Sequence, residues 1–133
     1  MIYLILVVLF WILAAICNAV SDTLDHHYYV SIFHRPENIN NARWTNFFNP
    51  EKSSISAYIL PFTKYKLDAW HLSKSLMIIF FVCSLLCAIK VPNIPILHTK
   101  WFLLTMFIGL GLFWNGTFNL FYNHLLKVKK WKI

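Results

Sequence analysis

Three long stretches without a charged side chain constrain the fold of this chain more than any other feature. They run from Met1 to Val20, from Ser75 to Ile89 and from Trp101 to Tyr122. A helix needs about 20 apolar residues to cross the ~30 Å hydrocarbon core of a bilayer, and the first and third stretches have that length. The second covers only about 22 Å as a helix. It spans if the helix begins near Asp68 and Lys74 extends its ammonium group to the interface.

The composition agrees with a membrane protein. Hydrophobic residues make up 59% of the 133 residues and charged residues 13%, which excludes an ordinary soluble domain. We predict an all-α fold: a single integral membrane domain over residues 1–133 with three transmembrane helices at about 1–20, 70–90 and 101–123, joined by a long cytoplasmic interfacial loop at 28–66. The first helix lacks the basic flank and small-residue cleavage site of a signal peptide, so we expect a retained anchor.

The long loop carries its own signals. Trp44, Phe47 and Phe48 are expected to dock it to the headgroup layer. Residues 54–60 are expected to form an interfacial helix or a strand.

Small residues within the spans predict packing. Gly109 and Gly111 interrupt the third span and favour close helix–helix contact. Cys17, Cys83 and Cys87 all lie inside spans, and their odd number argues against a disulfide framework. We expect them to be free packing residues.

The positive charges predict an orientation. Nine Lys and Arg residues lie in the 21–67 segment and the C-terminal tail, and two lie in the 90–101 loop. We predict that the protein lies in the cell (inner) membrane. The positive-inside rule then places the long loop and the tail in the cytoplasm and the N-terminus on the outer side of that membrane. The basic tail at 127–132 is expected to attract anionic lipids, and no motif accompanies it that would indicate nucleic acid.

Each span carries polar residues at one end, and helical spacing groups them into stripes. The first helix carries Asn18, Asp22, Asp25 and His26. The second carries Asp68, His71 and Ser75, with Lys74 adjacent, and the third carries Asn115, Asn119 and either Tyr122 or Asn123. Because the helices alternate in direction, all three stripes are expected at the cytoplasmic interface. Ionisable residues at membrane depth tend to mark function.

These residue types predict a catalytic site for a lipid or polyprenyl headgroup, of the hydrolase or transferase class. His71 is the expected base, with Asp25 or Asp68 orienting it. The expected substrate-binding residues, which would hold headgroup oxygens, are Asn18, Lys74, Asn119 and Asn123.

A divalent metal of the zinc or manganese type is a further expectation, with Asp22 and His26 as its ligands.

Simpler roles remain open for the same residues. Asp68 also suits the N-cap position of a helix. His26 also suits an exposed surface position, and the asparagines also suit hydrogen bonding between helices. The alternative function is a non-catalytic membrane subunit, assembly factor or phage-encoded envelope modulator. Its partners would be membrane lipids and either another membrane protein or a second copy of the chain. A transporter is disfavoured, because three helices are too few for a pore and the polar groups stop near one interface.

Two segments carry a resemblance, Asp68-Ala-Trp-His-Leu-Ser-Lys-Ser75 and Asn18-Ala-Val-Ser-Asp-Thr-Leu-Asp-His-His27. They resemble a family of small uncharacterised bacterial and phage-associated membrane proteins, which implies a similar first span and no particular activity. The chain also resembles the VanZ-like and Wnt-like membrane enzymes in placing Asp, His and Asn on short membrane helices around one interfacial pocket. That resemblance implies headgroup chemistry, although many of those enzymes have four or more spans.

Overall fold

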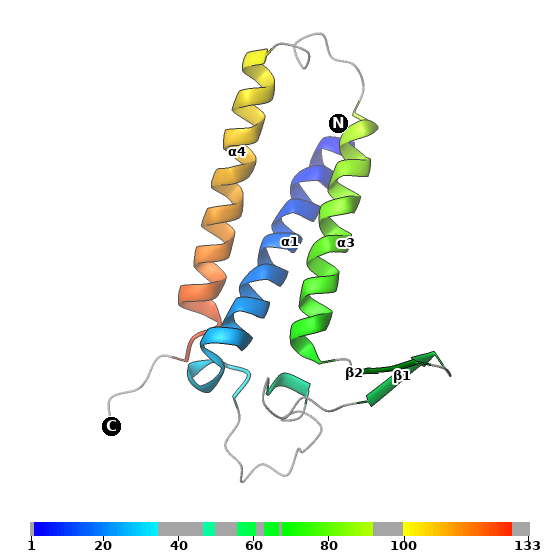
Figure 1. The fold of residues 1–133 in the computed structure, drawn as a ribbon. Coiled ribbons are helices and arrows are strands. Elements are labelled where there is room, and N and C mark those ends of the chain that lie inside the picture. The colour runs from blue at the N-terminus through cyan, green and yellow to red at the C-terminus, as the bar shows by residue number, and fades with distance from the viewer. Residues whose placement is uncertain are drawn as a thin grey trace.

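The computed structural model describes residues 2–34, 47–49, 56–60, 63–66, 68–91 and 100–128. Its framework consists of three long helices (Figure 1). These are α1 (Ile2–His26), α3 (Ala69–Ile89) and α4 (Lys100–Asn119), and α4 continues directly into a π-helical segment, η3 (Leu120–Leu125). The smaller elements are a 3₁₀ turn, η1 (Tyr28–Val30), and the strands β1 (Ser56–Leu60) and β2 (Thr63–Lys66).

Helix α1 is the central element, because it packs against both α3 and α4. The last turn of α1, the first turn of α3 and η3 lie at the same end of the bundle, at the bottom of Figure 1. We call this the polar end, since Asp22, Asp68, His71, Lys74 and Asn123 lie there. Polar residues of all three helices thus lie at one end of the bundle, and their placement at the cytoplasmic interface stays a prediction.

Small residues let α1 and α3 approach closely. Ala14, Ala15 and Ala19 are fully buried along α1. Near the other end of the pair, the Ser84 hydroxyl donates to the Val7 carbonyl at 3.1 Å. A side-chain-to-backbone hydrogen bond across two helices requires short interaxial separation, and small side chains permit it.

Trp11 connects all three helices. Its indole N–H donates to the Leu110 carbonyl of α4 at 2.8 Å. Its ring lies 5.0 Å from the Phe81 ring of α3 and 5.7 Å from the Trp114 ring of α4. A tryptophan buries a large apolar area and still needs an acceptor for its N–H. At this position Phe81 and Trp114 contact the ring, and the Leu110 carbonyl accepts the hydrogen bond.

Backbone pairing joins the polar ends of α1 and α4. Ile32 donates to the Leu126 carbonyl at 2.9 Å and Val128 donates to the Val30 carbonyl at 2.8 Å, which forms an antiparallel bridge. At the end of η3 the Leu126 N–H reaches back five residues to the carbonyl of Phe121. Insertions of this π-type re-aim the side chains that follow them and are frequent at functional sites.

An aromatic cluster closes the polar end. Leu24, Tyr28 and Ala69 are buried together, with Phe47 and Phe48 packed against them. These two phenylalanines, which were expected to dock the loop on the headgroup layer, thus bring part of the loop back to the helix ends. Trp44 lies outside the described residues.

The surface of the long helices is apolar. Within the described residues, α1 and α3 are long and apolar enough to cross a membrane, and only 28% and 11% of their most apolar segments are buried. A core helix of a soluble protein would be mostly covered, and large exposed apolar surfaces indicate contact with lipid or another protein. These two helices support membrane association. The third predicted span corresponds to α4 and η3, and several of its N-terminal side chains lie outside the described residues.

The all-α prediction holds for the framework, to which the structure adds a small hairpin. Strands β1 and β2 pair antiparallel, with Ser56 opposite Lys66 and Leu60 opposite Thr63. The 54–60 segment was expected as either a helix or a strand, and a strand occupies most of it.

The glycine prediction is wrong within the chain. A Cβ added at Gly109 or Gly111 would meet no atom within 4 Å, so neither glycine mediates close packing onto α1 or α3. The expectation of free thiols is confirmed, since none of the three cysteines forms a disulfide.

The α1–α3 contact generates a first prediction. Ala15→Leu forces extra volume into a fully buried position and should lower the free energy of unfolding by about 1–3 kcal/mol. Ala88→Leu is the matched control, because Ala88 is exposed on α3 and should change stability by less than about 0.5 kcal/mol. Denaturant titration in mild detergent measures both, and equal effects would contradict the packing described for α1 and α3.

Candidate functional site

Asp68 is held in place by the start of α3. It is the N-cap residue, and its side chain accepts a hydrogen bond from the backbone N–H of His71 at 2.7 Å. Asp is among the best N-cap residues because its oxygen satisfies an otherwise unpaired N–H of the first turn. The N-cap role considered from the sequence is therefore confirmed.

The same carboxylate contacts the His71 imidazole. Nδ1 of His71 lies 2.8 Å from both Oδ1 and Oδ2 of Asp68. The Asp68 side chain is 10% exposed and that of His71 is 59% exposed. A carboxylate bonded to Nδ1 favours the tautomer in which that nitrogen carries the proton, which leaves Nε2 as the acceptor. The pair thus combines a sheltered orienting group with an accessible base.

One turn further along α3, Lys74 ties α3 to α1. Its ammonium nitrogen lies 3.3 Å from Oδ1 of Asn18 and 3.4 Å from Oδ1 of Asp22. Asn18 in turn donates to the other Asp22 oxygen at 3.3 Å. The ammonium also lies 5.9 Å from the Trp70 ring centroid, within cation–π range.

The charges of Lys74 and Asp22 offset each other. Asp22 neutralises Lys74, and Asn18 provides a second acceptor. An ammonium group has three N–H donors, so one remains for an additional oxygen ligand. We call the five residues Asn18, Asp22, Asp68, His71 and Lys74 the α1–α3 polar network.

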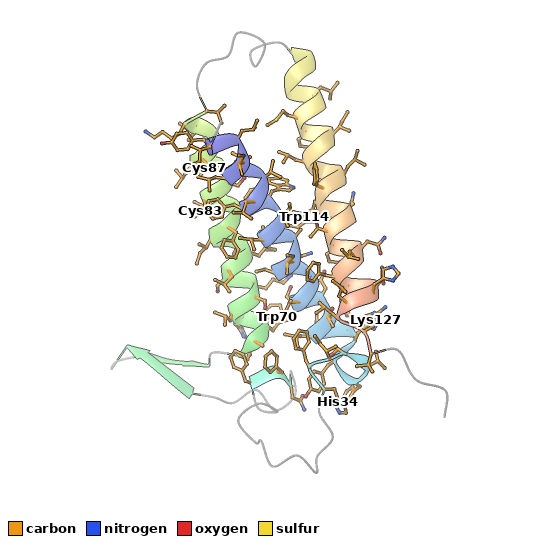
Figure 2. The ribbon with its side chains drawn as sticks, turned by 180° about the vertical axis from the view of Figure 1, so that it is seen from behind. His34, Trp70, Cys83, Cys87, Trp114 and Lys127 are labelled. Atoms are coloured by element: carbon orange, nitrogen blue, oxygen red, sulfur yellow. The ribbon has the colours of Figure 1, made fainter. Side chains whose placement is uncertain are left out.

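An apolar groove lies along the same helix. Met77, Ile78 and Phe81 of α3 and Trp114 of α4 line a cavity of about 320 Å³; Figure 2 labels Trp114 and shows the side chains of the bundle from behind. That volume is at the lower end of the range for ligand pockets. Residues 71, 74, 78 and 81 follow the helical repeat, so the polar network and the groove share one side of α3.

A second group of polar side chains follows the end of α4. Asn123 donates to Asn119 one turn earlier and accepts from Lys127 at 3.3 Å. The Lys127 ammonium lies 5.0 Å from the Tyr122 ring, and that ring contacts the His27 ring at 5.1 Å. We call Asn119, Asn123 and Lys127 the α4 polar row.

The two groups do not form one site. Asn119 and Asn123 are exposed and make no hydrogen bond to the α1–α3 polar network in the part of the chain that the structure describes. Whether the three stripes converge was left open by the sequence, and the structure brings together those of α1 and α3 but not that of α4. The reason is packing: α4 lies against α1, so α1 separates the α4 polar row from α3.

Asp25 is also outside the network. It lies 3.8 Å from His26, and both side chains are more than half exposed. Of the two candidate orienting groups for His71, the structure brings Asp68 into contact and leaves Asp25 on the surface.

The described residues contain no group of three or more His, Cys, Asp or Glu side chains able to hold a metal ion. The predicted ligands Asp22 and His26 have other neighbours, Lys74 and Asp25 respectively. Among the described residues, the structure therefore places no third ligand beside Asp22 and His26 for the predicted metal ion.

Sequence reasoning missed two aromatic contributions. Trp70 lies four residues before Lys74, and that spacing was a usable signal for a cation–π contact. Tyr122 lies five residues before Lys127, and α-helical spacing does not place such residues on one face. Lys127 follows the end of η3 and pairs with Ser31 in an isolated bridge, and this tertiary backbone contact, which residue spacing does not predict, accompanies its position over the Tyr122 ring.

Comparison with known protein families, curated proteins and solved structures finds no match to this chain. The functional argument therefore rests on the geometry of the site.

The Lys74–Asp22 pair generates a second prediction. A double-mutant cycle of Lys74→Met and Asp22→Asn should give a coupling of about 1 kcal/mol in unfolding free energy, as for polar pairs between membrane helices. Asp25→Asn with His26→Gln is the matched control cycle, and its more exposed pair should couple by less than about 0.3 kcal/mol. Equal couplings would show that Lys74 does not join α1 to α3.

A third prediction concerns His27. Its pKa is lowered by burial first, and then by the positive charge of Lys127 and by His26. The folded state therefore disfavours protonated His27. Its contribution to stability is present above the ordinary pKa of about 6.5 and is lost as the pH falls through the lower folded-state value.

Lys127→Met removes one of these causes and should raise the pKa of His27 toward its ordinary value. NMR titration of the imidazole in detergent micelles measures the shift. Lys90→Met, at the other end of α3, is the control and should leave the titration unchanged. An unchanged midpoint in Lys127→Met would contradict the arrangement of Lys127, Tyr122 and His27.

Proposed function

We propose that this protein is a three-span integral membrane enzyme that hydrolyses or transfers a lipid or polyprenyl headgroup at the cytoplasmic interface. In this proposal His71 is the general base, Asp68 orients it, and Lys74 holds an anionic oxygen of the headgroup. The observation that carries the proposal is the placement of His71 and Lys74 on the same side of α3 as the apolar groove formed with Trp114.

The membrane placement is supported by two features. Helices α1 and α3 have the length and apolar surface of membrane spans, and α4 lies beside α1 with large exposed side chains such as Phe107 and Leu112. Nine Lys and Arg residues in the long loop and tail, against two in the 90–101 loop, favour a cytoplasmic polar end.

The geometry suits a two-part ligand. The polar network at the start of α3 matches the depth at which headgroups lie. The groove lined by Ile78, Phe81 and Trp114 extends into the apolar part of the bundle and fits a hydrocarbon chain. A lipid bound this way would present its headgroup linkage to His71.

The chemical step follows from these positions. Nε2 of His71 takes a proton from water or from an acceptor hydroxyl, and the resulting oxygen nucleophile bonds to the carbonyl carbon or phosphorus of the headgroup linkage. The bond to the leaving oxygen then breaks, and that oxygen receives the proton from the imidazolium. Asp68 stabilises the imidazolium, and the remaining N–H of Lys74 donates to the developing oxyanion.

The fourth prediction tests this role. Purified protein incubated with bacterial lipid extract and with polyprenyl phosphates should release a headgroup product that mass spectrometry detects. His71→Ala should lower the rate by about 10²- to 10⁴-fold, the usual contribution of a general base. Asp68→Asn should also lower it while the protein stays folded, because Asn caps a helix as well as Asp does.

His26→Ala is the matched control, since His26 is an exposed histidine at the same end of the bundle and should keep the wild-type rate. Equal rates in wild type and His71→Ala would disprove the proposed base. If the wild type releases no product and instead co-purifies with another membrane protein regardless of His71→Ala, the non-catalytic subunit is the better account.

A further inference from the structure

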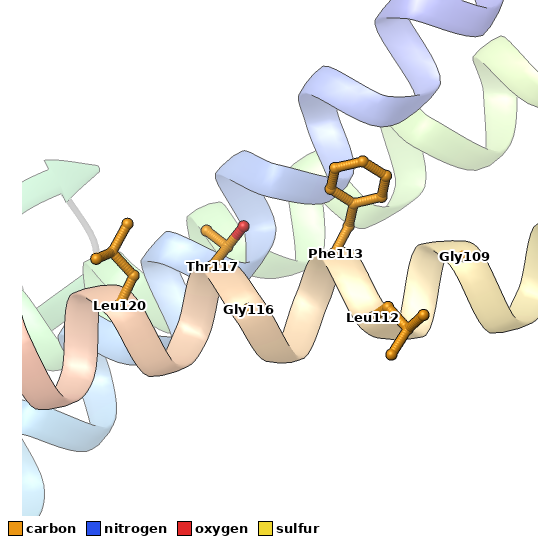
Figure 3. A pocket seen from close by; sticks show the side chains of 6 residues that line it. All are labelled: Gly109, Leu112, Phe113, Gly116, Thr117 and Leu120. Atoms are coloured by element: carbon orange, nitrogen blue, oxygen red, sulfur yellow. The ribbon is translucent and has the colours of Figure 1, made fainter.

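Asn115 is a polar residue without a hydrogen-bond partner in the part of the chain that the structure describes. It lies on the exposed surface of α4. The surrounding side chains on that surface are large and apolar, including Ile108 at 53% and Leu112 at 68% exposure. Figure 3 shows Leu112 pointing away from the other two helices.

Its depth makes this exposure costly. In the proposed three-span arrangement, Asn115 lies eight residues before Asn123, or about 12 Å along the helix axis from the interface. A side-chain amide placed in hydrocarbon without a partner carries a penalty of several kcal/mol. A membrane span that retains such a residue therefore favours a polar contact from another helix.

The residues around Asn115 form a seam. Ile108, Leu112, Asn115 and Asn119 follow one another at spacings of four, three and four, the spacing of the contact positions in a left-handed helix pair. All four are exposed. Within the described residues, the opposite side of α4 packs against α1, where Leu110 and Trp114 contact Trp11.

We propose that this seam is a homodimer interface, in which Asn115 of one copy hydrogen-bonds to Asn115 of a second copy. Every copy has the same orientation in the membrane, so the two amides lie at the same depth about a two-fold axis. An amide is both a donor and an acceptor, and is therefore complementary to itself. A second copy supplies the missing partner automatically, whereas a different protein would need a polar group at that same depth.

The shape of α4 agrees with close approach of a second helix. Beside the seam, Gly109, Leu112, Phe113, Gly116, Thr117 and Leu120 line an open apolar depression of about 420 Å³ (Figure 3). The glycines have open space where a Cβ would stand.

The inference rests on the membrane placement of α4 in the proposed function and not on catalysis by His71. Cross-linking tests it in a full-length chain whose three native cysteines are replaced by alanine. Ile108→Cys and Leu112→Cys should form disulfide-linked dimers on oxidation in native membranes, because contact positions bring Cα atoms within about 7 Å. Leu85→Cys, exposed on α3, is the control and should remain monomeric.

The amide itself is tested by Förster transfer between labelled chains in vesicles at increasing lipid dilution. Asn115→Leu should weaken dimerisation by about 3- to 30-fold, the range for interhelical hydrogen bonds. Asn115→Gln, which keeps the amide, should retain most of the association.

Three outcomes would overturn the homodimer: no cross-link at either seam position, equal cross-linking of Leu85→Cys, or unchanged association of Asn115→Leu. Labelling of Leu112→Cys by a membrane-impermeant maleimide separates the two proposals. Rapid labelling would refute the membrane placement of α4. Protection without dimerisation would refute the interface alone and leave the proposed function standing.

Discussion

The contact between Lys74 and the Asn18–Asp22 pair is the interaction on which the polar end depends. It joins the first turns of α3 to the last turns of α1, and it satisfies a charge that would otherwise stand alone beside apolar surface. An unpaired charge beside apolar surface is costly, so the pairing also fixes how far α3 is shifted along α1. That shift places Asp68 and His71 at the end of the bundle and Phe81 against Trp11.

The arrangement separates two kinds of polar chemistry. On the α3 side, a sheltered carboxylate orients an accessible imidazole next to a neutralised ammonium group. On the α4 side, Tyr122, His27 and Lys127 form a group in which burial and positive charge keep the pKa of His27 low. Helix α1 packs against both α3 and α4 and lies between the two groups.

The apolar surroundings give the remaining features their meaning. An exposed Asn115 would be unremarked on a soluble helix, where water satisfies it. In the membrane placement that we propose for α4, the same amide requires a protein partner. The open glycines of α4 point the same way, since a helix without neighbours at that surface offers room for another backbone. The exposed residues of α4 therefore indicate what this protein contacts, as its buried residues indicate how it packs.

The sequence by itself determined the helical framework, the polar segment at one end of each long helix, and the local Asp68–His71 pair, because each depends on residues close in the chain. Helical periodicity and the N-cap preference of Asp are local physics. Tertiary structure decided which stripes meet. Lys74 reaches Asp22 only because α3 packs on α1 through small residues. The asparagines of α4 face outward because α4 packs on α1 through Trp11. The contact of Tyr122 with Lys127 forms where the chain leaves η3 and pairs with Ser31, a long-range backbone contact that residue spacing does not encode.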